Sequence, residues 1–227
     1  MKTFLFVVLP FSFIMAVITE KSGFSKKYGL QTKMLCSAMF VLTGIASFFA
    51  HGTITSYSVV MLCALACGFF GDFLLSYKNE KYFLSGVVFF ALGHIIYSFA
   101  FLFPGTLILK FRMLLVFIIS ALITAALIGV LRKRTNLGRY QKFLFVYGGI
   151  LVFSFVSGVF RGISEFSDTR NIPFGICVLA GALLFFISDV CLGMSMGGIK
   201  LAKPFTHIVL YTYFPAQTFF ALSIFFH

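Results

Sequence analysis

The chain has 227 residues, of which 60% are hydrophobic and 11% are charged, and its mean hydropathy is +1.05. These values exclude an ordinary soluble domain, which carries about a quarter charged residues. The net charge of +12 is spread over short turns between apolar runs, which argues against a nucleic-acid partner. The composition therefore predicts an integral membrane protein without a soluble domain.

Apolar runs of about membrane-spanning length follow one another along the whole chain. They lack the in/out alternation of barrel strands, so we expect an all-α single polytopic domain over residues 1–227. Since no small-residue cleavage site follows the first run, it is expected to be a retained helix rather than a signal peptide. The eight predicted spans are residues 3–19, 34–50, 57–76, 82–103, 108–131, 143–162, 172–195 and 204–226.

The lysines and arginines fall mostly on one side of these spans. Thirteen of the eighteen lie in the turns after the first, third, fifth and seventh spans. Because basic residues concentrate in cytoplasmic loops, this distribution predicts that both termini are extracytoplasmic. The expected location is the plasma membrane, or the inner membrane in a bacterium.

The cysteines and short motifs favour no cofactor. All five cysteines lie within apolar spans, where a free cysteine behaves as a small hydrophobic residue. Cys63 and Cys67 share a helix face, but no histidine or second cysteine pair accompanies them. Walker and HExxH motifs are absent from the sequence. We therefore predict no metal and no other cofactor.

The six acidic residues divide into two groups. Asp72 and Asp189 lie inside apolar spans, each about one to one and a half helical turns before the predicted cytoplasmic end. A carboxylate there costs free energy unless a partner or a function compensates it. Matching depth predicts one shared site, and the alternative is that a neighbouring Ser, Tyr or His satisfies each aspartate separately. The other four are expected in solvated loops: Glu20, Glu80, Glu165 and Asp168.

A faint internal repeat supports the shared site. The third span ends GDFLLS and the seventh ends SDVCLGMS, and each is followed by a lysine-bearing turn and a helix with His or Tyr. Asp72 precedes His94 by 22 residues, and Asp189 precedes Tyr211 by 22. The pattern suggests a 4+4 repeat about an axis along the membrane normal, with both aspartates facing a central cavity.

The helices that follow the aspartates carry candidate companions. His94 and Tyr97 share one face of the fourth span, and Tyr213 and Gln217 share one face of the eighth. Hydrogen bonds between membrane helices would explain any one of them alone. As a set they indicate the wall of a pocket.

Four segments resemble the YhhN-like membrane proteins, whose animal members are the lysoplasmalogenases: GDFLLS, YFLSGVVFFALGHIIY, GALLFFISD and TYFPAQ. The resemblance implies an eight-helix hydrolase that cleaves the vinyl ether bond of lysoplasmalogens. It also implies that Lys33, which matches a lysine opening the second span, belongs with the recurring polar positions. Met34 and Phe214 depart from the family pattern, which has Pro and Tyr there, and this affects substrate specificity more than the reaction class.

Vinyl ether hydrolysis requires a proton donor to carbon and a base that activates water. Our hypothesis is that Asp72 and Asp189 divide these catalytic roles, in an order that the sequence leaves open. Lys33, His94, Tyr97, Tyr213 and Gln217 are the predicted substrate-binding residues, with a lysophospholipid in the cytoplasmic leaflet as the partner. The alternative function is a proton- or cation-coupled transporter that uses the same Asp and His residues.

Overall fold

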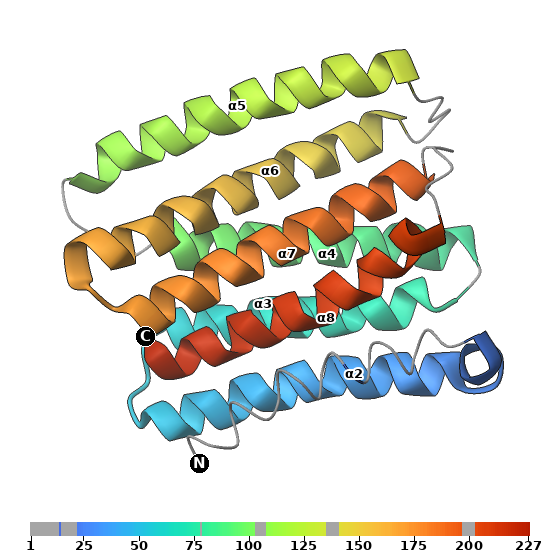
Figure 1. The fold of residues 1–227 in the computed structure, drawn as a ribbon, viewed down its shortest axis with the longest axis horizontal. Coiled ribbons are helices and arrows are strands. Elements are labelled where there is room, and N and C mark those ends of the chain that lie inside the picture. The colour runs from blue at the N-terminus through green and yellow to red at the C-terminus, as the bar shows by residue number, and fades with distance from the viewer. Residues whose placement is uncertain (1–13, 15–21, 78, 103–107, 135–140, 197–202) are drawn as a thin grey trace.

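The protein is described here by a computed structural model (Figure 1). It describes residue 14 and residues 22–77, 79–102, 108–134, 141–196 and 203–227. In that part of the chain all regular structure is helical. The helices are α2 (Ser22–His51), α3 (Ser56–Leu75), α4 (Glu80–Leu102), α5 (Ile108–Arg134), α6 (Gln141–Ser164), the short π-helix η2 (Glu165–Thr169), α7 (Ile172–Met196) and α8 (Lys203–Phe226).

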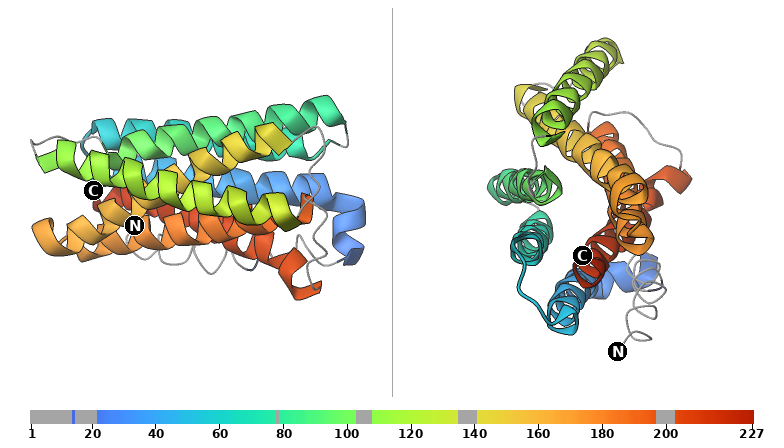
Figure 2. Two further views of the ribbon diagram at one scale, coloured as in Figure 1. Left: turned by 90° about the horizontal axis from the view of Figure 1, so that it is seen from above. Right: turned by 90° about the vertical axis from the view of Figure 1, so that its left-hand side faces the viewer.

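Six of the long helices form a closed ring, and the seventh lies outside it. Around the ring, α2 packs on α3, α3 on α4, α4 on α6, α6 on α7, α7 on α8, and α8 on α2. Helix α8 also contacts α3 across the ring, and α5 packs mainly against α6. Figure 2 shows α5 at the margin of the bundle, beyond α6. Side chains inside the ring are therefore shielded from the surroundings, whereas most of α5 is not.

Seven of the described helices are long and apolar enough to cross a membrane. They correspond to the second through eighth predicted spans. Helix α2 begins at Ser22 rather than near residue 34, because the polar segment before the apolar run continues the helix. The predicted first span, residues 3–19, lies outside the described residues apart from Ile14. The total of eight membrane-spanning helices, which depends on that first span, therefore remains a prediction. The 4+4 repeat and the extracytoplasmic location of the termini also remain predictions.

Local sequence explains how the chain passes from α2 to α3. Gly52 has a positive φ of 82°, a conformation that glycine adopts without a steric penalty. Thr55 then caps α3: its hydroxyl accepts from the Ser58 N–H at 3.1 Å, and the Ser58 hydroxyl accepts from the Thr55 N–H at 3.3 Å. This capping box satisfies two backbone donors at the start of α3 that have no partner within the helix.

Large aromatic side chains fill the centre of the ring. Phe40 of α2, Tyr97 of α4, and Phe214 and Phe220 of α8 are almost completely buried. Each ring contacts other aromatic rings of the core, as in the tilted contact of Tyr97 with Phe220 at 4.5 Å between centroids. The polar residues inside this apolar core are the ones that require an explanation.

Candidate functional site

Asp72 is buried near the end of α3, with 2% of its surface exposed. Its Oδ1 lies 3.2 Å from the Lys33 Nζ of α2. Its Oδ2 accepts hydrogen bonds from the Ser37 hydroxyl at 2.7 Å and from the Tyr213 hydroxyl at 2.8 Å. Asp72 therefore joins α2, α3 and α8 through one charge pair and two hydroxyl donors.

The backbone at Asp72 is held by the same neighbours. Its carbonyl oxygen accepts from Lys33 Nζ at 3.3 Å and from the Ser76 hydroxyl at 2.7 Å. A carbonyl in the last turn of a helix has no partner within the helix, so these contacts complete the end of α3. Lys33 thus neutralises the carboxylate and also stabilises the helix terminus.

A chain of side-chain hydrogen bonds leads from Asp72 across the ring. The Gln217 amide nitrogen donates to the Tyr213 hydroxyl at 3.3 Å, and the Tyr97 hydroxyl donates to Gln217 Oε1 at 2.5 Å. All three side chains are buried. The chain carries polar contacts from α2 through α3 and α8 to α4.

Asp189 of α7 belongs to a second network. Its Oδ2 lies 3.0 Å from the His94 Nε2 of α4 and accepts a short hydrogen bond from the Tyr147 hydroxyl of α6. Asp189 is 6% exposed, and His94 is buried as well. A carboxylate, an imidazole and a phenol therefore meet among three helices away from bulk water.

The ring of Phe185 lies between the two networks. Its centroid is 4.4 Å from that of His94, 6.1 Å from that of Tyr97 and 5.4 Å from that of Tyr213. Asp72 lies three residues before the end of α3, and Asp189 lies seven residues before the end of α7. Phe185 therefore separates His94 of the second network from Tyr97 and Tyr213 of the first, and a site shared by the two aspartates remains a prediction.

The structure assigns each predicted site residue to one of these networks. Lys33, Asp72, Tyr213, Gln217 and Tyr97 form the first, and Asp189 and His94 belong to the second. Their roles in binding or catalysis remain predictions. His94 and Tyr97, expected to act together, contact different networks although they lie one turn apart on α4.

Two further members escaped the sequence reasoning. Ser37 lies one helical turn after Lys33 and could have been recognised from this spacing, although its hydroxyl also bonds the Lys33 carbonyl at 3.0 Å. Tyr147 gave no local signal, because its contact with Asp189 depends on the packing of α6 against α7.

Residues 193–197 read GMSMG and match the G-x-S-x-G pattern of hydrolases with a serine nucleophile. Ser195 lies in the last turn of α7, not at the strand-to-helix elbow which that motif requires.

The prediction that Glu165 lies in a solvated loop is wrong. Glu165 is 5% exposed, begins η2, and pairs with Arg161 at 2.8 Å one turn earlier. Arg161 also lies over the ring of Phe174, 5.3 Å from its centroid. Helix α6 continues directly into η2, so Glu165 lies on a helix with its side chain buried where polarity alone predicted a loop.

His227, to which the sequence assigned no role, belongs to the same end of the bundle. Its ring stacks on Tyr57 at 4.3 Å, and the Tyr57 hydroxyl lies 2.6 Å from the Ser223 hydroxyl. Burial lowers the pKa of His227 to about 4 from its ordinary 6.5, and the nearby Arg161 charge acts in the same direction. These contacts fix the end of α8 against α3.

The described part of the chain offers few side chains that could bind a metal ion together. All five cysteines are free, and no group of three His, Cys, Asp or Glu side chains meets there. The Asp189–His94 pair supplies two ligand types but not a third. What the site offers is proton transfer among a carboxylate, an imidazole and a phenol, together with an ammonium group beside the second carboxylate.

The sequence was compared with known families, curated proteins and solved structures. A sequence model of the YhhN family matches residues 30–224. No curated protein and no solved structure matches the chain. The matched range includes every residue of both networks.

Proposed function

Since the chain belongs to the YhhN family, we propose that it is a membrane-embedded hydrolase that cleaves the vinyl ether bond of lysoplasmalogens. The products are a fatty aldehyde and glycerophosphoethanolamine or glycerophosphocholine. The observation that carries the proposal is the buried contact of Asp189 with His94 and Tyr147. Such a cluster is suited to moving a proton at a site from which bulk water is excluded.

We assign the proton-transfer role to Asp189 because it contacts His94, whose imidazole can both accept and donate a proton, whereas Asp72 has the Lys33 ammonium as its counter-ion. In the first step, protonated Asp189 donates its proton to the vinyl ether carbon and leaves an oxocarbenium ion. The Asp189 carboxylate, with His94 beside it, then takes a proton from the water that attacks this ion. The resulting hemiacetal collapses to the aldehyde and the free glycerol hydroxyl, and one water is consumed overall.

Asp72 is assigned to the headgroup end of the substrate. Its counter-ion, Lys33, is 19% exposed at the side chain, and an ammonium has three donors of which two contact Asp72. We propose that the third donor binds the lipid phosphate near the cytoplasmic interface. Tyr213 then holds the carboxylate, and Gln217 and Tyr97 continue the hydrogen-bonded chain from it across the ring.

The test is aldehyde release from lysoplasmalogen by the purified protein. Asp189→Asn should lower the rate by about 10²–10⁴-fold, the usual contribution of a general acid or base. Tyr147→Phe removes only the hydroxyl that contacts Asp189 and should also slow the reaction. The matched control is Ser157→Ala on the same helix, because the Ser157 hydroxyl bonds only its own helix at Phe153 in the described contacts.

Two results would reject the assignment. Equal aldehyde release from wild type and Asp189→Asn would exclude Asp189 as the proton-transfer group. No release from wild type, together with proton or cation flux in liposomes that Asp189→Asn abolishes, would favour the transporter instead.

A further inference from the structure

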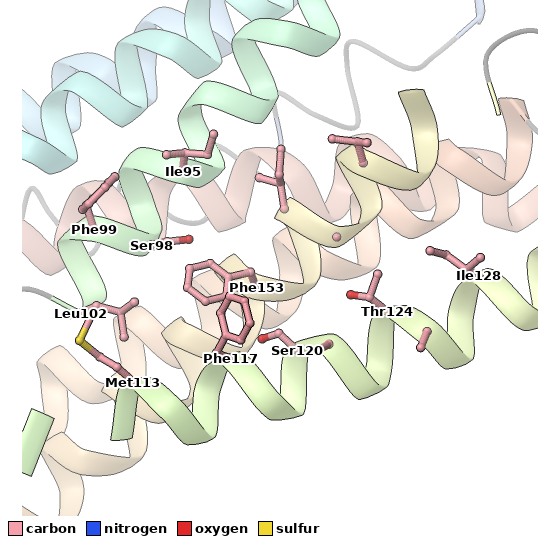
Figure 3. A pocket seen from close by; sticks show the side chains of 15 residues that line it. Ile95, Ser98, Phe99, Leu102, Met113, Phe117, Ser120, Thr124, Ile128 and Phe153 are labelled. Carbon is pink, nitrogen blue, oxygen red and sulfur yellow. The ribbon is translucent and has the colours of Figure 1, made fainter. Parts of the chain in front are cut away.

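An apolar pocket of about 750 Å³ lies among α4, α5 and α6, outside both polar networks. Figure 3 shows side chains from the three helices converging on it, with Phe117 of α5 and Phe153 of α6 near its middle. These two rings are 6.4 Å apart between centroids. The volume lies within the usual range for small-molecule sites, about 300–1,000 Å³.

The walls of the pocket are suited to hydrocarbon. Eleven of the fifteen lining residues are aliphatic or aromatic, with Met113 counted among them. Two of the three hydroxyls are already engaged in their own helices: Ser98 donates to the His94 carbonyl at 2.8 Å and Ser120 to the Val116 carbonyl at 2.6 Å. A polar ligand group would therefore find few partners here, whereas an alkyl chain requires none.

The pocket adjoins the Asp189 network on two helices. On α4, Ile95 and Ser98 of the lining follow His94 directly and by one turn. On α6, Val146 of the lining directly precedes Tyr147, and Ile150 follows it by about one turn. The pocket and the Asp189 network therefore share α4 and α6, although no lining residue is itself a member of that network.

The shape of the pocket fits a long chain that enters from the bilayer. Its lining on α5 runs from Met113 to Ile128, which corresponds to about 22 Å of helix. Phe117 is 66% exposed although it lines the pocket, and α5 packs mainly against α6. The wall formed by α5 is therefore open to surrounding lipid, and a hydrocarbon chain can enter without crossing water.

We propose that this pocket holds the single aliphatic chain of the substrate while the headgroup stays at the interface. The inference rests on the proposed function for the identity of the lipid, a single-chain glycerophospholipid. With the chain in this pocket, its first carbons, where the vinyl ether lies, must pass between α4 and α6 towards Asp189. The pocket thereby selects for one chain and for its length.

Binding can be measured without catalysis because the chain contains no tryptophan. Phe153→Trp introduces a single fluorophore in the pocket, and Leu122→Trp introduces one on the exposed side of α5. The probe is an ester-linked lysophosphatidylethanolamine with bromine atoms in its chain, which quenches nearby tryptophan and has no vinyl ether to cleave. Quenching of Phe153→Trp should saturate and be reversed by unbrominated lysolipid, whereas quenching of Leu122→Trp should rise only with bulk lipid.

A matched pair of glycines on α6 tests the pocket through chain length. A Cβ at Gly149 would lie 3.6 Å from Thr124 Cγ2 inside the pocket, whereas a Cβ at Gly148 meets nothing within 4 Å. Gly149→Leu should therefore fill the pocket and weaken binding of the longest chains by roughly tenfold, with less effect on short chains. Gly148→Leu should leave the chain-length profile unchanged.

The outcomes separate this proposal from the proposed function. Saturable quenching at Phe153→Trp without aldehyde release would support the pocket and reject the hydrolase. Aldehyde release with identical behaviour of the two tryptophan variants, or of the two glycine variants, would overturn the pocket and leave the hydrolase standing. Equal displacement of the probe by a two-chain phospholipid would show an ordinary bilayer lipid site and also overturn the proposal.

Discussion

The Lys33–Asp72 pair gives a quantitative test of how the first network is held. Lys33→Met removes the counter-ion and leaves Asp72, 2% exposed, with only the Ser37 and Tyr213 hydroxyls on its carboxylate. Removing one partner of a buried ion pair typically costs about 3–5 kcal/mol. Because the Lys33 side chain is 19% exposed, we expect a loss near the lower end, about 3 kcal/mol.

Substitution of the other partner, Asp72, should lower the free energy of unfolding by less. In Asp72→Asn the amide oxygen still accepts from a hydroxyl, and Lys33 can extend its ammonium towards the interface, so we expect a loss of about 1–2 kcal/mol. In the double variant no unpaired charge remains, so its stability should be close to that of Asp72→Asn alone. The expected coupling energy is therefore equal in size to the Lys33→Met loss, about 3 kcal/mol.

Equilibrium unfolding of the four proteins in mixed micelles, followed by circular dichroism, measures this cycle. Lys81→Met is the control, because Lys81 is exposed in the first turn of α4 and its loss should change stability by less than about 0.5 kcal/mol. If the losses of the two single variants simply add in the double variant, the pair is not coupled and the argument for Lys33 as counter-ion is wrong.

Two further predictions concern His227, which follows α8, and Gly181, which lies in the helix ring. Because burial lowers the pKa of His227 to about 4, the unfolded chain binds its proton first as the pH falls, so thermal stability should decline between about pH 6.5 and 4; His227→Gln should flatten this decline, and an unchanged pH slope would contradict it. At Gly181 an added Cβ would lie 2.5 Å from the Phe220 ring, so Gly181→Ala should lower stability by about 1–3 kcal/mol in the same unfolding assay. Gly193→Ala on the same helix, where a Cβ meets nothing within 4 Å, should not lower it.

The helices were predictable because a membrane-spanning segment must satisfy its backbone within itself and be apolar over a fixed length. Those two requirements locate Ser56–Leu75 or Ile172–Met196 to within a residue or two. They say nothing about polar residues that continue a helix, so the start of α2 and the helical, buried position of Glu165 were missed. Polarity indicates a turn only when the segment lies in water, and Glu165 is paired with Arg161 instead.

The buried aspartates and several companions were recognisable because each is a polar residue in an apolar run. Which companion meets which aspartate depends on helix adjacency, and sequence spacing does not encode it. His94 contacts Asp189 across 95 residues, and Tyr97 contacts Gln217 across 120. Tyr147 was missed because only the packing of α6 on α7 gives it a partner.

The two networks are also suited to different roles, the first to stabilising the fold and binding the substrate and the second to the chemical step. Asp72 joins α2, α3 and α8 and has the Lys33 ammonium as its counter-ion. This arrangement favours a carboxylate that stays paired with Lys33. Asp189 joins α4, α6 and α7 through an imidazole and a phenol, and two of these helices line the apolar pocket. A reaction that needs a mobile proton next to a hydrocarbon chain is therefore better served by Asp189. Substitutions at Asp72 should accordingly act more on stability and substrate binding, and those at Asp189 more on the chemical step.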